Sequence, residues 1–229
     1  MKRTTDLSAR VEKAPVWDLP TRLFHWTLAA LIGFSWWSAE EEKLDWHMWS
    51  GYAVMTLVIF RLLWGLFGSS TARFANFIRG PSAVLAYLRD SKGWQAIGHS
   101  PLGALSVVAL LGLTILQVAT GLFNADDDGL VEGPLSPLVS FDLSETAHDL
   151  HNLLFNVLLA FIALHVAAIL FYRLFQGKKL LGPMISGRAA LDPGVEPMRP
   201  GRGWVAIVCL AAALGLTRWI IGGAPPFGS

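Results

Sequence analysis

The chain has 229 residues, of which 53% are hydrophobic and only 15% charged, and its mean hydropathy is +0.48. Soluble domains carry about 25% charged residues, so this composition excludes an ordinary soluble domain and indicates a membrane protein. The single cysteine, Cys209, excludes an internal disulfide and any metal or iron–sulfur site built from several thiolates of this chain, and the absence of C-x-x-C-H excludes covalent c-type haem.

Five stretches are apolar enough, at roughly 20 residues each, to cross roughly 30 Å of hydrocarbon as helices. They cover approximately 20–39, 46–67, 102–123, 150–172 and 204–222. Asp18 and Pro20 are typical of the cap and first turn of a helix. The polar segment 1–19 has no apolar stretch before a small-residue cleavage site, so we expect no removable signal peptide. The sequence therefore predicts an all-α integral membrane helix bundle.

Three polar stretches connect these spans. The first, 69–98, is basic and is predicted to hold a short surface helix around 81–90. The second, 124–147, begins with Asp126, Asp127 and Asp128 and is predicted to be an extramembrane loop. The third, 177–203, is rich in Gly, Pro and cations and is predicted to link the last span to the rest.

The cations define an orientation. With the N-terminus in the cytoplasm, 15 of the 18 Lys and Arg residues fall on the inner side, as the positive-inside rule requires. Eleven acidic residues fall outside: Glu40, Glu41, Glu42, Asp45, Asp126, Asp127, Asp128, Glu132, Asp142, Glu145 and Asp149. We therefore expect a multi-pass protein of the bacterial cytoplasmic (inner) membrane, with the N-terminus inside and the C-terminus outside.

Four histidines lie within or at the ends of the spans, and they fall at two depths. His25 lies near the inner end of the first span and His47 at the outer start of the second. His151 lies near the outer start of the fourth span, and His165 follows after fourteen residues, about 21 Å further in. Fourteen residues are close to four helical turns, so both face the same way. The depths therefore pair His47 with His151 and His25 with His165.

Two imidazoles facing each other inside an apolar bundle are typical axial ligands of haem iron. With both axial positions filled, such iron is suited to passing single electrons. The sequence thus predicts two haem b groups, with His25 and His165 as the inner ligands and His47 and His151 as the outer ones. The alternative for each histidine is a packed, hydrogen-bonded role, but intramembrane ionisable residues are functional by default.

Three further residues are open to more than one interpretation. His99 and His148 lie at predicted interfaces, which favours a surface role or a role beside a haem. Arg61 lies within the second span. Its guanidinium either reaches the inner interface or binds a propionate of the inner haem, for which its fork is well shaped.

Several motifs resemble the bacterial dihaem cytochrome b561 family, which includes the cytochrome b subunits of membrane-bound nickel–iron hydrogenases. They are VWDLPTRLFHW, HMWSG, GHSPLGALS and the two histidines of the fourth span with thirteen residues between them, and the similarity covers about residues 14–190. The resemblance implies four core helices with two b-type haems, held by the same pairs that the depths indicate. It also implies electron exchange between a quinone pool and a redox partner.

The expected organisation has four parts. Residues 1–19 form a cytoplasmic segment, 20–176 a four-helix haem-binding membrane domain, 177–203 a cytoplasmic linker, and 204–229 a fifth transmembrane helix with a short outer tail. The fold is thus a four-helix dihaem core plus a fifth C-terminal transmembrane helix.

Three functions are compatible with this pattern. The favoured one is an electron-transfer subunit that links quinone or quinol to an extracytoplasmic redox protein with a basic surface, for example a c-type cytochrome. The second is a quinone-coupled oxidoreductase acting alone, similar to superoxide oxidases, and the third is a non-redox metal-binding or transport protein. A bound quinone and a homo-oligomer are left open, membrane lipid surrounds the spans, and no nucleic-acid partner is expected. Because fold does not fix reaction, the choice rests on the site.

Overall fold

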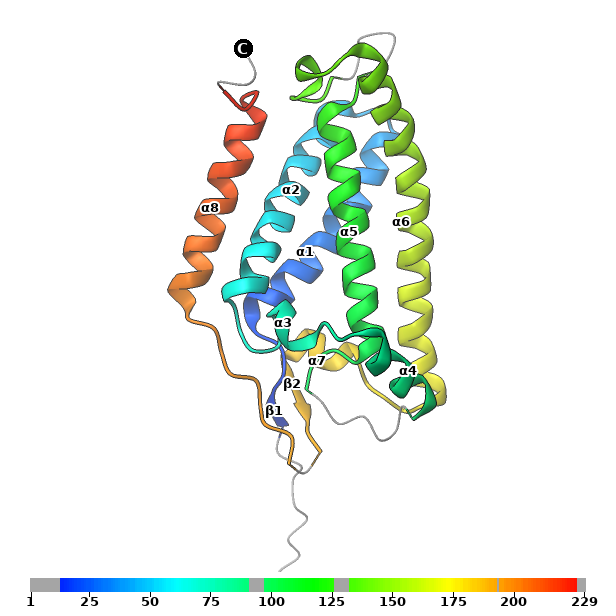
Figure 1. Cartoon of the computed structure of the whole chain (residues 1–229), viewed down its shortest axis with the longest axis vertical. Coiled ribbons are helices and arrows are strands. Elements are labelled where there is room, and N and C mark those ends of the chain that lie inside the picture. Colours follow the sequence, from blue (N-terminus) through cyan, green and yellow to red (C-terminus); the bar gives the residue numbers. More distant parts are fainter. Residues whose placement is uncertain (1–12, 91–96, 126–131, 193, 226–229) are drawn as a thin grey trace, which may run out of the picture.

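The structure is a computed structural model that describes residues 13–90, 97–125, 132–192 and 194–225. Five long helices dominate it: α1 (Leu19–Glu40), α2 (Leu44–Phe67), α5 (Pro101–Phe123), α6 (Phe141–Phe175) and α8 (Gly203–Ile221). Figure 1 shows them running roughly side by side along the long axis of the molecule. The expectation of an all-α membrane helix bundle is confirmed.

Four of the helices in the described part of the chain are long and apolar enough to cross a membrane: α2, α5, α6 and α8. The helix α1 has 22 residues, enough for a crossing, but it does not reach the same apolar content. Its sequence includes several tryptophan, serine and threonine residues and His25, which lower its hydropathy. It nevertheless packs along α2.

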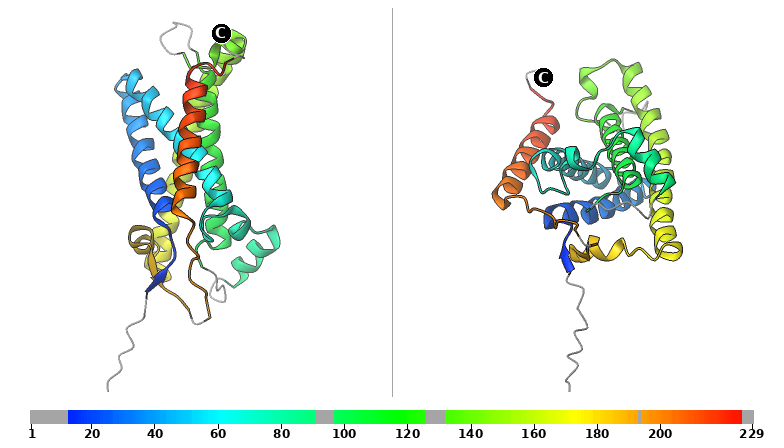
Figure 2. Two further views of the ribbon diagram at one scale, coloured as in Figure 1. Left: turned by 90° about the vertical axis from the view of Figure 1, so that its left-hand side faces the viewer. Right: turned by 60° about the horizontal axis from the view of Figure 1, so that its bottom comes forward.

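The bundle is built from two helix pairs. The helix α1 packs against α2, α5 packs against α6, and α2 joins the pairs by contacting α5. Val54 and Val58 of α2 meet Leu111 of α5 in one buried cluster. On its other side α2 packs against α8, where Phe60 and Trp64 contact buried residues of α8. The two views of Figure 2 show α8 outside the four-helix core.

The expected cap of the first span is confirmed, and the structure adds a second cap of the same kind. Asp18 caps α1, since its Oδ1 accepts a hydrogen bond from the Thr21 N–H at 2.6 Å. Ser100 caps α5 in the same way, accepting from the Gly103 N–H at 3.2 Å. Proline follows the cap in both helices, where its missing N–H is not needed and its fixed φ suits the first turn.

Two of the polar connections contain more structure than the sequence predicted. The helix α6 begins at Phe141, so the end of the expected 124–147 loop is helical. Hydropathy detects only the apolar part of this helix, because its first nine residues include Asp142, Glu145 and Asp149. The preceding connection also holds a 3₁₀ turn, η1 (Ser136–Leu138), while Asp126, Asp127 and Asp128 lie outside the described residues.

The region 177–203 is likewise more than a linker. It contains α7 (Leu181–Ser186) and the strand β2 (Arg188–Ala190), which pairs antiparallel with β1 (Lys13–Pro15). In the region 69–98, α4 (Pro81–Arg89) matches the expected surface helix, and a single turn, α3 (Phe74–Phe77), precedes it. No hydropathy pattern foretells a strand pair whose members are more than 170 residues apart.

The two ends of the bundle differ in charge and in construction. One end holds β1, β2, α3, α4, α7 and most of the cations, and we call it the basic end. The other end holds the turn between α1 and α2 and the start of α6, with most of the acidic residues, and we call it the acidic end. Backbone hydrogen bonds tie the basic end together: the Val16 and Trp17 N–H groups donate to the Gly187 carbonyl, and the Met198 N–H donates to the Pro15 carbonyl.

Candidate functional site

At the acidic end, the structure brings His47 and His151 together. His47 lies in the first turn of α2, and His151 lies on α6, far away in the sequence. The centres of their rings are 6.0 Å apart, and the ring planes are nearly perpendicular, at 81°. The pair predicted from depth is therefore a pair in space.

Both rings are oriented through the same nitrogen. The Nδ1 atom of His47 donates to the Ser35 carbonyl of α1 at 2.9 Å, and the Nδ1 atom of His151 donates to the Gln117 carbonyl of α5 at 3.0 Å. A carbonyl oxygen can only accept, so each Nδ1 carries the proton and each Nε2 keeps its lone pair. Among the described residues, none forms a hydrogen bond with either Nε2. An N–H that donates to a backbone carbonyl is the usual way in which proteins fix the tautomer of a metal-bound histidine.

The separation of the two rings matches one shared metal ion. An imidazole nitrogen lies about 2 Å from a bound metal and about 1 Å from the centre of its own ring, so two axial imidazoles have centres roughly 6 Å apart. The observed 6.0 Å fits this geometry.

A glycine leaves room beside this pair. A Cβ atom added to Gly121 of α5 would lie 3.0 Å from Cε1 of His151, which is tighter than an ordinary contact. On the same helix, a Cβ atom added to Gly112 would meet nothing within 4 Å. Gly121 therefore allows the α5 backbone to approach the His151 ring, close to the carbonyl that holds it.

At the basic end, His25 of α1 and His165 of α6 lie within electrostatic range of each other. Nδ1 of His165 lies 3.2 Å from the Ser106 hydroxyl of α5. Nδ1 of His25 is buried and has no hydrogen-bond partner within the described part of the chain. Buried polar nitrogens usually have a hydrogen-bond partner. The unpaired Nδ1 of His25 therefore indicates that this site is completed by a group other than the protein.

Arg61 is buried at the same end, with its guanidinium carbon 6.0 Å from the ring centre of Phe24, the residue before His25. It is only 3% exposed, its Nη1 donates to the Ala72 carbonyl at 3.1 Å, and its guanidinium carbon lies 4.7 Å from the centre of the Phe74 ring. A side chain so enclosed does not carry its charge to water at the interface, so that alternative does not fit. A role toward a haem propionate stays a prediction.

The two remaining histidines differ from each other. Nδ1 of His148 lies 3.0 Å from Asn124 Oδ1, and its Nε2 lies 3.1 Å from Asn152 Nδ2, so both ring nitrogens have amide partners. His99 packs between the rings of Trp17 and Phe77, with centres 4.6 and 4.4 Å away. His148 thus neighbours the acidic-end pair without facing it, while the role of His99, at the surface or beside a haem, stays a prediction.

Burial, together with the nearby Arg61 guanidinium, lowers the pKa of His99 to about 3. The ring is therefore neutral at physiological pH. Its Nδ1 is buried without a hydrogen-bond partner among the residues that the structure describes. The turn that presents it explains part of the GHSPLG motif: Gly98 has a φ of +84°, which favours glycine, and Ser100 and Pro101 start α5.

The family comparison agrees with this arrangement. The family model of prokaryotic cytochrome b561 matches residues 16–187, which include all four paired histidines. The chain belongs to the prokaryotic cytochrome b561 family. It is therefore a multi-pass membrane protein that binds haem b and transfers electrons. No curated protein and no solved structure gave a significant match.

The residues present fit haem b. The acidic-end pair offers two Nε2 lone pairs on rings whose centres are 6.0 Å apart, and the basic-end pair offers two further imidazoles with one unsatisfied buried nitrogen. The described part of the chain holds no cluster of three or more His, Cys, Asp or Glu side chains that could bind a metal ion.

Sequence reasoning missed the residues that orient the imidazoles. Ser35 and Gln117 act through backbone carbonyls, which every residue has, so no side-chain pattern identifies them. Ser106 and Gly121 left a weak signal, because a hydroxyl and a glycine in an apolar span often mark close packing or a polar neighbour.

Proposed function

We propose that this member of the family is a dihaem cytochrome b that carries electrons across the bacterial cytoplasmic membrane, between the quinone pool and a redox partner at the acidic end. One haem b lies between His47 and His151 and the other between His25 and His165. The observation that supports this proposal most directly is the geometry of His47 and His151. Their ring centres are 6.0 Å apart, and both Nδ1 atoms donate hydrogen bonds to backbone carbonyls. The excess of cations at the basic end supports placing that end in the cytoplasm.

The roles of the protein groups follow from their positions. Bound haem b supplies one-electron redox chemistry. The four imidazoles would hold two haems, two imidazoles to each, while the carbonyls of Ser35 and Gln117 keep two of the rings in the required tautomer. The long axis of α6 sets the spacing of the two sites, since His151 and His165 are fourteen residues apart.

A pyridine haemochrome assay on the purified protein, together with a reduced-minus-oxidised spectrum, tests the proposal. We expect two b-type haems per chain, both six-coordinate and low-spin. A stoichiometry near one, or a high-spin spectrum in intact protein, would contradict it. The same sample without reductant serves as the spectral control.

We place the quinone at the basic end, beside His25 and His165. His165 is only half-buried, and its neighbour Leu164 is 64% exposed toward lipid, so a lipid-soluble quinone can reach this region from the membrane. Arg22, Arg61 and Arg173 add positive charge, which stabilises a reduced quinone or haem propionates. Arg22 and Arg61 already donate to the carbonyls of Ile185 and Ala72, which holds them in place.

Quinol-driven haem reduction in an Arg61→Ala variant tests this placement. We expect slower reduction by quinol with unchanged reduction by dithionite, because only the quinol reaction depends on the cation. Arg79→Ala, also at the basic end but on the surface, is the matched control. Unchanged quinol kinetics in Arg61→Ala with intact haem content would remove Arg61 from the quinone site.

The partner at the acidic end is expected to have a basic surface, for example a c-type cytochrome. Clustered charge of one sign raises the encounter rate with an oppositely charged protein. Glu145 and Asp149 are exposed on the first turns of α6, near His151. The alternative is that the carboxylates only keep this end solvated.

Salt dependence distinguishes these alternatives. Electron exchange with a basic cytochrome c should slow as ionic strength rises, because charges are screened over about 8 Å at physiological salt. Glu145→Gln/Asp149→Asn should slow it at low salt, whereas Asp192→Asn/Glu196→Gln at the basic end should not. A rate indifferent to salt and to both pairs of substitutions would refute the basic partner.

A further inference from the structure

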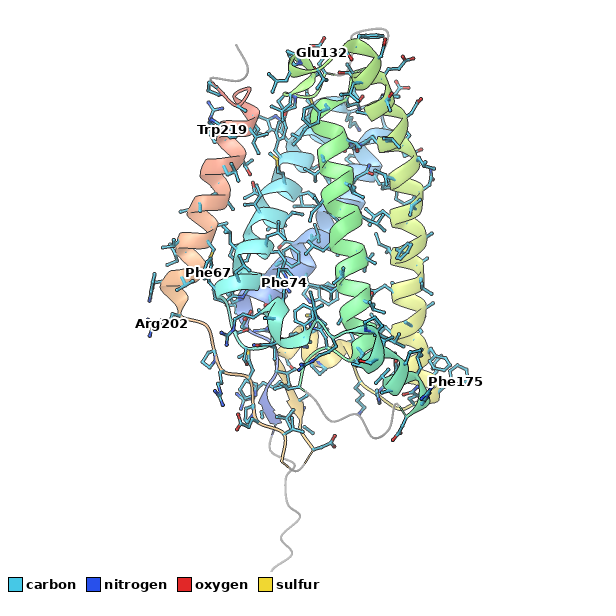
Figure 3. All side chains as sticks on the ribbon, viewed as in Figure 1. Phe67, Phe74, Glu132, Phe175, Arg202 and Trp219 are labelled. Carbon is cyan, nitrogen blue, oxygen red and sulfur yellow. The ribbon has the colours of Figure 1, made fainter. Side chains whose placement is uncertain are left out.

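A groove lies between the end of α2 and the start of α8, at the basic end. It encloses about 570 Å³. Its apolar walls come from both helices: Leu63 and Phe67 of α2, and Val205, Val208 and Ala212 of α8. Figure 3 labels Phe67 and Arg202 at this place, on α2 and at the start of α8. Because α8 lies beyond the residues that the family model matches, the groove is a feature of this chain added to the family core.

Three arginines line the same groove: Arg73, Arg199 and Arg202. All three are exposed. Arg199 forms an ion pair with Glu196 at 2.7 Å, with both side chains about three-quarters exposed, so part of its charge is compensated. Arg73 and Arg202 form no ion pair with any residue in the described ranges. The groove therefore combines an apolar wall with at least two uncompensated cations.

The backbone fixes the positions of these arginines. The Ser70 N–H donates to the Arg199 carbonyl at 3.0 Å, and the Arg199 N–H donates to the Ser70 hydroxyl at 2.9 Å. Gly201 lets the chain approach Trp64, since a Cβ atom there would lie 2.6 Å from Trp64 Cη2. The segment before α8 is thus held against the end of α2, which brings the backbone of Arg199 and Arg202 to the groove that Arg73 also lines.

We propose that this groove binds an anionic phospholipid of the leaflet at the basic end. The phosphate lies among Arg73, Arg199 and Arg202, and an acyl chain lies along the wall formed by Leu63, Val205 and Val208. Basic pockets between transmembrane helices bind anionic headgroups in this way. Trp204, which is 60% exposed beside the groove, is the kind of residue that lies at headgroup level. A free phosphate would use the cations but would make no contact with the apolar wall.

Native mass spectrometry of the delipidated protein in detergent tests the proposal, with dioleoyl phosphatidylglycerol as the probe and dioleoyl phosphatidylcholine as the neutral comparison. We expect one tightly bound phosphatidylglycerol. Replacing two arginines, in Arg73→Gln/Arg202→Gln, should weaken binding about 30-fold, because each cation near a membrane contributes about 1 kcal/mol and a factor of 30 corresponds to about 2 kcal/mol. Phosphatidylcholine should bind the wild-type protein no better than it binds this variant.

Two controls keep the result interpretable. Arg79→Gln/Arg89→Gln removes the same charge from the same end outside the groove and should change the affinity by less than about threefold. Arg73→Lys/Arg202→Lys keeps the charge and should retain most of the binding. If the glutamine variant is unstable, this variant shows whether the weaker binding comes from the lost charge or from a failure to fold. The haem spectrum should stay the same in all variants, so the lipid site and the proposed electron-transfer function fail independently.

Three results would overturn the proposal. The first is equal affinity for phosphatidylglycerol and phosphatidylcholine. The second is equal weakening in the Arg79/Arg89 control, which would indicate non-specific surface attraction. The third is displacement of the lipid by millimolar inorganic phosphate, which would indicate a simple anion site.

Discussion

The two histidine pairs occupy equivalent positions at opposite ends of the bundle, yet they are held differently. At the acidic end, both Nδ1 atoms donate to backbone carbonyls, and the rings are already 6.0 Å apart. At the basic end, His165 contacts only a serine hydroxyl, and Nδ1 of His25 has no partner in the described part of the chain. The acidic-end site is preorganised, whereas the basic-end site depends more on the group that it binds.

This difference has a physical origin. A backbone carbonyl in a helix is fixed by the helix itself, so a histidine that donates to it loses little further freedom when it binds a metal. A serine hydroxyl rotates and can either donate or accept, so it specifies the tautomer of His165 less strongly. We therefore expect the acidic-end haem to be held more firmly and to respond differently to changes in its surroundings.

The largest effect is expected from removing the ligands themselves. His47→Ala and His151→Ala should each eliminate the same haem, and His25→Ala and His165→Ala should each eliminate the other. Haem content should fall from two per chain to one, as measured by pyridine haemochrome, with redox titration identifying the surviving component. If the His47 and His25 variants lose the same component, the pairing is wrong.

The next largest effect concerns acid stability and a third imidazole at the basic end, His99. Its pKa of about 3 in the folded protein is below the ordinary 6.5. Between these two pH values the imidazole is therefore protonated in the unfolded state and neutral in the native state. Stability is therefore lost as the pH falls from 6.5 toward 3, by about 2 kcal/mol at pH 5. Chemical denaturation in detergent at pH 7 and pH 5 should show that His99→Gln abolishes this loss.

The acidic end offers the matched control for His99. His148 has amide partners on both ring nitrogens, and His148→Gln should leave the wild-type loss of stability between pH 7 and pH 5 in place. If the His99 and His148 variants behave alike, the burial of His99 is not the cause of the acid sensitivity.

A smaller effect is expected from Gly121→Ala, which tests the preorganisation of the acidic-end site. The new methyl group would lie 3.0 Å from Cε1 of His151, so the ring must move away from the Gln117 carbonyl. Disturbing an outer-shell contact typically weakens metal binding about tenfold, and we expect a comparable loss of haem affinity at this end. Gly112→Ala, with open space around it, should leave haem binding unchanged, and equal losses in both would point to a general effect on α5.

The smallest effect is expected at the basic end, from Ser106→Ala. Because the hydroxyl constrains His165 only weakly, its removal should shift the midpoint potential of the basic-end haem by about 60 mV or less, which is a factor of ten or less for one electron. Spectrally resolved redox titration would measure the shift, and the acidic-end component should not move. Loss of the haem would mean that Ser106 holds His165 more strongly than this comparison implies.

Hydropathy located all five long helices to within a few residues except at the start of α6, whose first two turns are polar and extend beyond the apolar stretch. The caps at Asp18 and Ser100 follow from local chemistry, because a side-chain oxygen next to a helix start satisfies a free N–H within the same few residues. The pairing of His47 with His151 could be predicted from periodicity and helix rise, because the position of a residue along a membrane-spanning helix gives its depth in the membrane.

The sequence by itself thus determined the class of the protein, the spans and the four histidines, because lipid selects for apolar length and local caps select for particular residues. Only the tertiary structure decided which carbonyls orient the rings, how β1 pairs with β2, and that Arg73, Arg199 and Arg202 line one groove with the apolar faces of α2 and α8. The carbonyl and strand contacts join residues from 12 to more than 170 positions apart through backbone groups that every residue carries. Their partners are chosen by how the helices pack, and no local pattern records that choice.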